Sequence, residues 1–89
     1  MHAVVVSVTV HDREAAVSEL NEQVVPRERG APGFVASYWI ALPNGQGRGT
    51  IVFDSEGAAQ AAAGQIQARR QREAVTIDSV EVGEVVAHA

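Results

Sequence analysis

Apolar and polar positions alternate near the start of the chain. Four valines at every second position share one face of an extended segment, namely Val4, Val6, Val8 and Val10. This alternation, together with the density of β-branched residues, predicts a strand over residues 4–10. The opposite face carries Val5, Ser7 and Thr9, which are not strongly polar. We therefore expect both faces of this strand to be covered.

A helical period follows the first strand. Val17, Leu20 and Val24 recur at i, i+3 and i+7, and Asp12 is a suitable N-cap ahead of them. Pro26 has no backbone N–H, so it predicts a helix end near residue 25. Residues 27–33, with their glycines and a proline, are then predicted to form a loop.

The middle of the chain predicts a hairpin followed by a second helix. Strand-like runs over residues 34–42 and 48–53 flank Asn44-Gly45, a pair that tolerates the positive φ angles of tight hairpins. Ser55 is the expected N-cap of a helix over residues 56–70. Its predicted inner stripe consists of Ala59, Ala62, Ala63 and Ile66. A last strand is predicted over residues 75–86, with a bulge at Gly83.

The resulting order β-α-β-β-α-β predicts a single α+β domain over residues 1–89. With right-handed crossovers it gives a ferredoxin-like sandwich, in which an antiparallel sheet of order 4-1-3-2 carries both helices on one face. The uncovered face would then expose a large apolar area, which soluble monomers rarely do. We expect a two-fold homodimer that packs the two sheets together.

Composition and charge narrow the chemistry. The 89 residues contain no cysteine, and all seven basic residues are arginine. These facts exclude thiolate, zinc–cysteine and lysine Schiff-base sites. The net charge of −4 argues against nucleic acid as a partner, and also against an RNA-recognition module of the same topology. No apolar run is long enough to span a membrane, and no signal peptide is evident, so we expect a cytoplasmic protein.

Several segments resemble a known family. Pro32-Gly33-Phe34-Val35 opens the predicted second strand, and Ile51-Val52-Phe53-Asp54-Ser55 leads into a helix that contains Glu56 and Ala58-Ala59. The chain closes on the valine-rich run of residues 80–86. This pattern is similar to the dimeric α/β-barrel superfamily, and specifically to its antibiotic-biosynthesis-monooxygenase-like branch. The resemblance implies a homodimeric α/β barrel with a pocket in each subunit between sheet and helices.

The resemblance also implies a range of activities. Some members oxidise polycyclic aromatics without a cofactor, and others degrade haem with a Trp and an iron-ligating His on the second helix and an Asn on strand one. Residues 56–72 of this chain contain neither Trp nor His, and residues 4–10 contain no Asn. We therefore expect no haem degradation, no cofactor and no metal.

The candidate site residues are few. Trp39, Ser37 and Phe53, with Val6 from the first strand, are predicted to line a pocket for a small apolar or aromatic molecule. Ordinary core filling is the competing interpretation of Trp39. His11 is the candidate general base, because we expect it at the same end of the sheet as Arg48, which would favour a neutral imidazole. A solvated His11 beside the Asp12 cap is the alternative.

Two further groups are weaker candidates. His2 and His88 are predicted to meet at neighbouring strand ends, and Arg69, Arg70 and Arg72 form a basic cluster at the end of the second helix. Frayed termini and a dipole-compatible helix end are the competing interpretations. For the whole chain two functions stay open: a cofactor-independent monooxygenase acting on a small aromatic substrate, and a non-catalytic homodimer that binds a ligand or has a structural role.

Overall fold

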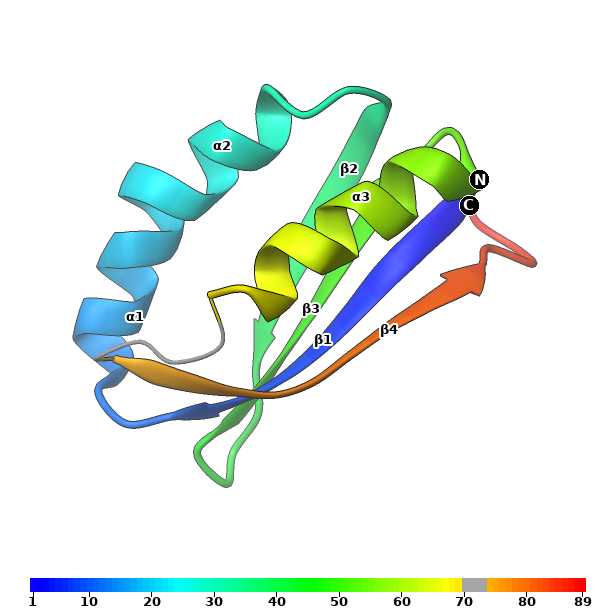
Figure 1. Ribbon diagram of the computed structural model, residues 1–89. Helices are drawn as coiled ribbons and strands as arrows, with labels where there is room; N and C mark the ends of the chain where they lie inside the picture. The colour runs from blue at the N-terminus through cyan, green and yellow to red at the C-terminus, as the bar shows by residue number, and fades with distance from the viewer. Residues whose placement is uncertain (70–73) are drawn as a thin grey trace.

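The fold consists of one antiparallel sheet with helices on one face. The computed structural model describes residues 1–69 and 74–89. Its strands are β1 (His2–Val10), β2 (Phe34–Ala41), β3 (Gln46–Phe53) and β4 (Val75–Glu84). They lie in the order β2-β3-β1-β4, and every neighbouring pair is antiparallel. This confirms the ferredoxin-like order predicted from the sequence, and Figure 1 shows both helical segments on the same side of the sheet.

The core lies between the sheet and the helices. The valines at positions 4, 6 and 8 are buried, and Ile51 and Phe53 of β3 are each only 1% exposed. Phe34 packs edge-on against Phe53, with ring centroids 6.3 Å apart. The α3 helix (Glu56–Gln67) presents Ala59 and Ala63 to this core. Small side chains on its inner face let the helix pack closely against the sheet, as the alanine stripe predicted.

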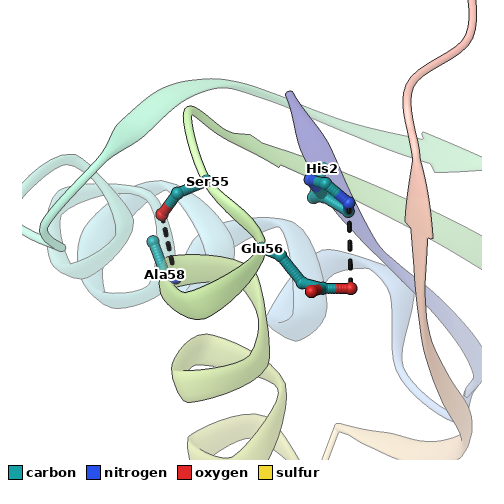
Figure 2. Close-up of polar contacts among 4 residues, drawn as sticks. All are labelled: His2, Ser55, Glu56 and Ala58. Carbon is teal, nitrogen blue, oxygen red and sulfur yellow. Dashed lines mark hydrogen bonds and ion pairs between the residues drawn. The ribbon is translucent and has the colours of Figure 1, made fainter.

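Both predicted N-caps are present. The Ala15 N–H donates to Asp12 Oδ1 at 3.1 Å, where α1 (Arg13–Glu19) begins. The Ala58 N–H donates to Ser55 Oγ at 3.2 Å at the start of α3 (Figure 2). Each side chain satisfies a backbone donor that the helix cannot satisfy itself, which explains why these helices begin where they do.

Pro26 does not end the first helical segment, so the prediction of a loop over residues 27–33 was wrong in its first half. Residues Leu20–Val24 form a π-helical turn, in which the Val25 N–H bonds to the Leu20 carbonyl five residues back. The chain then continues as α2 (Val25–Arg29), with Pro26 in its first turn. Proline is tolerated there, because a first-turn N–H has no partner within the helix. The wider turn thus carries the helix past Pro26 and brings α2 over the sheet.

Irregularities in the sheet also differ from the prediction. Ser7 pairs with Ser79 but Val8 pairs with Ile77, so the extra residue of β4 is Asp78 and not Gly83. The Thr9 hydroxyl donates to Asp78 Oδ2 at 2.7 Å, which gives the bulged residue a cross-strand partner. In the hairpin, only Gly45 has a positive φ, of 78°, so Asn44 does not share the left-handed conformation that the Asn-Gly pair suggested.

The second face of the sheet carries exposed apolar side chains. Tyr38 is 66% exposed, Ile40 53% and Val5 39%. Their cross-strand partners Thr50 and Arg48 place them on the same side, opposite the helices.

Within the described residues, no helix is both long and apolar enough to cross a membrane.

Candidate functional site

A cavity of about 190 Å³ lies between the sheet and the helical segments. Its walls come from β1 to β4, from both parts of the first helical segment and from α3. Most lining side chains are apolar, among them Val8, Leu20, Phe53 and Ile66. An apolar cavity of about 150 Å³ is known to hold a benzene molecule, so this one has room for a somewhat larger ring compound.

Two glycines of β3 make this cavity possible. Gly49 pairs with Trp39 on one side and with Val6 on the other, so all three positions share the helix-facing side of the sheet. A β-carbon added at Gly49 would overlap the Trp39 ring, which shows that the indole lies flat across this glycine. Gly47 also lines the cavity, and a β-carbon there would approach Val8 Cγ2 to 3.0 Å. The absence of side chains at these two positions of β3 therefore provides both the platform for Trp39 and part of the cavity floor.

Glu28 is the carboxyl group at this cavity wall that contacts Trp39. It projects from α2 and is half-buried. The Trp39 Nε1–H lies 3.4 Å from Glu28 Oε1 and 3.3 Å from Oε2, so one donor is shared between both oxygens. Such long, shared contacts leave lone pairs on the carboxylate for another donor. The arrangement gives the apolar cavity an acceptor held in a defined position.

The environment of Glu28 changes its acidity. Burial raises the pKa of Glu28 above its ordinary value of 4.5, although hydrogen bonds from Ser37 and Trp39 act in the opposite direction. Desolvation penalises the charged form, whereas donors favour it, and here burial is the larger effect. A carboxylate with a raised pKa is a better proton acceptor than an ordinary surface glutamate.

The raised pKa of Glu28 predicts a pH-dependent stability. Just above pH 4.5 the native protein binds more protons at this group than the unfolded chain does, so ionising Glu28 lowers the free energy of unfolding as the pH rises. Glu28→Gln cannot ionise. We expect its stability relative to wild type to increase between about pH 4 and about pH 7, measured by urea unfolding. Glu22→Gln changes an exposed position outside the cavity and is the matched control. Identical pH profiles of stability for Glu28→Gln and wild type would contradict the conclusion that burial raises the pKa of Glu28.

The structure distributes the predicted pocket residues over three places. Trp39 and Phe53 line the cavity. Ser37 lies beside Glu28 and lines an adjoining groove between β2 and the first helical segment. Val6 is fully buried in the core and does not line the cavity, because Trp39 covers the neighbouring Gly49 on this side of the sheet.

The histidines lie elsewhere. His11 is exposed, its Nε2 is 2.7 Å from the Thr76 hydroxyl, and it does not line the cavity. His2 Nε2 lies 3.9 Å from Glu56 Oε2 near the start of α3 (Figure 2), whereas His88 is exposed beyond β4. Among residues 1–69 and 74–89 no group of three His, Asp or Glu side chains could hold a metal ion.

The predicted arginine cluster is only partly described. Arg69 lines the cavity, whereas Arg70 and Arg72 lie outside the described residues.

The sequence pattern indicates that Glu28 belongs to the site, but the helix end predicted at Pro26 led us to miss it. Val17, Leu20 and Val24 recur at helical spacing and all line the cavity, and position 28 follows at the next helical interval. A glutamate that continues an apolar stripe is a candidate for a desolvated carboxyl. The interpretation of Pro26 as a stop removed residue 28 from the helix, and so from the site.

Comparisons with known proteins identify the fold. No protein-family profile and no curated protein sequence matches this chain. Among solved structures, HapK from Hahella chejuensis superposes with a TM-score of 0.68 at 15% identity, covering 100% of this chain and 96% of HapK. The haem-degrader MhuD from Mycobacterium tuberculosis, solved with two haems in its active site, superposes with a TM-score of 0.65 at 21% identity, covering 100% and 99%. Both have the fold of antibiotic-biosynthesis-monooxygenase-like proteins, and this chain therefore shares that fold.

Proposed function

We propose that this chain binds a small, largely apolar ring compound in the cavity and that Glu28 removes a proton from it. The observation that carries the proposal is the half-buried Glu28 carboxyl at an apolar wall, in contact with Trp39 and with a raised pKa. A perturbed titratable group in a concave apolar site is the usual signature of acid–base chemistry. The shared fold with monooxygenase-like proteins supports an oxidation as the overall reaction.

The proposed chemistry needs dioxygen as its only co-reactant. A substrate CH₂ group, acidified by an adjacent ring carbonyl, gives one proton to Glu28, and the carbanion adds dioxygen to form a C–O bond. The peroxide oxygen takes that proton back. Glu28 then removes the second C–H proton as the O–O bond breaks, so that the carbon becomes a carbonyl and the departing hydroxide leaves as water. The substrate supplies the four electrons that reduce dioxygen, and Glu28 ends as it began.

The dimensions of the cavity favour a ring compound smaller than haem. Its volume is about 190 Å³, which suits one or two rings better than a porphyrin. The described lining residues include no histidine to bind an iron from the side. We therefore propose a substrate class different from the haem that MhuD, by its description, degrades.

Ligand binding without turnover is the second candidate. The described cavity lining is mostly apolar, and its carboxyl groups are Glu19 and Glu28. Catalytic pockets usually combine several polar groups with distinct roles. A carboxyl that only orients a bound ligand would give the same geometry, and proton-exchange measurements separate the two candidates.

Filling the cavity is the direct test of the binding site. We expect 2-indanone to change the fluorescence of Trp39, the single tryptophan of the chain, in a saturable manner. Ala62 lines the cavity, whereas Ala61 is exposed on α3 and does not. Ala62→Phe is expected to weaken binding by at least about tenfold because its ring occupies the ligand's space, and Ala61→Phe is expected to bind as wild type does. No saturable change in the wild type, or equal binding by both variants, would remove the proposed site.

We further infer that the chain forms a homodimer through the open face of its sheet. Val5, Tyr38 and Ile40 are exposed there, and Arg48 and Glu81 occupy the same face. Two-fold pairing would cover the apolar side chains and bring opposite charges together.

A further inference from the structure

The rim of the cavity is unusually basic for this chain. On the helical side of the sheet the cavity is lined by Arg13, Arg27 and Arg69 together with Glu19 and Glu28, whereas the whole chain carries a net charge of −4. Arg13 begins α1, and Arg69 follows the last turn of α3, so two opposite walls each contribute one guanidinium. Among the described residues, neither arginine has an ion-pair partner. These two side chains are therefore available to a ligand.

The two charged ends of the cavity are well separated. Figure 1 shows the start of α1 and the end of α3 toward the same end of the molecule, whereas α2, which carries Glu28, lies toward the other. Fifteen residues separate Arg13 from Glu28, which corresponds to about 20 Å along the helix axis. The long side chain of Arg13 spans part of this distance. The space between is apolar, with Leu20 and Ile66 among its walls.

We propose that the ligand of this cavity is an elongated ring compound with a carboxylate at one end and a hydrogen-bond donor at the other. The carboxylate would bind Arg13 and Arg69 at the rim, and the donor would face Glu28. In the opposite orientation the ligand carboxylate would lie at the α2 end, where the Glu28 carboxylate repels it and Arg27 is the one guanidinium among the described lining residues of α2. Guanidinium groups bind carboxylates through paired hydrogen bonds, so they suit this end of the ligand. This inference rests on the proposed function, because it names the substrate class of the same cavity.

A pair of probe molecules tests the inference by isothermal titration calorimetry. The probes 6-hydroxy-2-naphthoate and 2-naphthol share two rings and a hydroxyl donor, but only the first carries a carboxylate. We expect the naphthoate to bind wild type at least about tenfold more tightly at low ionic strength, because charge-assisted hydrogen bonds are the strong ones. This advantage should shrink as salt is added, since the rim is exposed to solvent.

Arginine variants locate the effect. In Arg13→Gln/Arg69→Gln the naphthoate should lose its advantage, whereas the affinity for 2-naphthol should stay within about twofold of wild type. Arg29→Gln removes one positive charge from α2 at an exposed position that does not line the cavity, and it should keep the full advantage. Circular dichroism and thermal melting would establish that each variant is folded before it is titrated.

The outcomes separate this inference from the proposed function. If 2-naphthol binds and the naphthoate binds no better, the carboxylate class is wrong and the apolar cavity stands. An advantage that survives in the double variant, or disappears in Arg29→Gln, would likewise overturn the role of Arg13 and Arg69. If neither probe binds to folded wild type, the proposed function fails and the inference fails with it.

Discussion

Replacing Glu28 with glutamine is expected to slow proton removal from a carbon acid in the cavity by about 10² to 10⁴-fold, the usual contribution of a positioned general base. Glutamine preserves the shape of the side chain and still accepts a hydrogen bond from the Trp39 indole, which now contacts both carboxylate oxygens. It cannot take up a proton. The variant therefore separates the chemical role of the group from its contribution to packing.

Exchange of the CH₂ protons of 2-indanone with deuterium, followed by NMR in D₂O, measures this step without any requirement for dioxygen. Exchange should be faster with wild type than in buffer alone. Its rate should rise with pH as Glu28 loses its proton, and this rise should lie at a higher pH than the ordinary glutamate pKa of 4.5 because burial raises the pKa of Glu28. Glu28→Asp keeps the carboxylate but withdraws it toward α2, so an intermediate rate is expected. Glu22→Gln, exposed and outside the cavity, is the matched control and should exchange as wild type does.

The possible results discriminate between the two proposed functions. Exchange at the wild-type rate in Glu28→Gln would exclude this carboxyl as the base. Saturable binding of 2-indanone by wild type with no acceleration of exchange would favour the non-catalytic alternative. Acceleration of exchange together with uptake of dioxygen would support the complete oxidation.

Local signals in the sequence predicted most of the fold. The alternation of valines in β1, the side-chain caps Asp12 and Ser55, and the alanine stripe of α3 all correspond to interactions within or between neighbouring elements. Such interactions leave a direct trace in residue spacing. The sheet order then followed from the order of elements and the handedness of crossovers.

The site was less predictable because it depends on departures from regular structure. The π-helical turn over Leu20–Val24 lets the chain continue beyond Pro26, and only this continuation places Glu28 beside Trp39. π-Helical turns are often found at functional sites, but the spacing of apolar residues does not predict them. The bulge at Asp78 depends on a contact with Thr9 of another strand, so no local pattern could distinguish it from Gly83.

The homodimer proposed above predicts a large effect of single charges on the open face of the sheet. We expect wild type to have twice the monomer mass at about 10 μM in sedimentation equilibrium. Ile40→Lys or Val5→Glu should raise the dimer dissociation constant by at least about 100-fold, because each new charge would be buried beside a like charge. That like charge is Arg48 for Ile40→Lys and Glu81 for Val5→Glu. Ile40 is 53% and Val5 39% exposed in the isolated chain, so either charged side chain can be solvated in the monomer without disturbing the core.

A matched control lies on the helical side. Val17 is 45% exposed on α1, and Val17→Lys is expected to leave the mass unchanged. A monomeric wild type at about 100 μM, or dimers in the Ile40 and Val5 variants, would contradict pairing through the open face.

Dimer formation is also expected to affect the cavity. Tyr38 and Ile40 flank Trp39 on β2 and point to the open face, whereas Trp39 contacts Glu28 on the helical face. Packing of Tyr38 and Ile40 against a second subunit would therefore fix the position of β2 and of Trp39. The monomeric Val5 variant is therefore expected to bind 2-indanone several-fold more weakly than the dimer, although Val5 does not line the cavity.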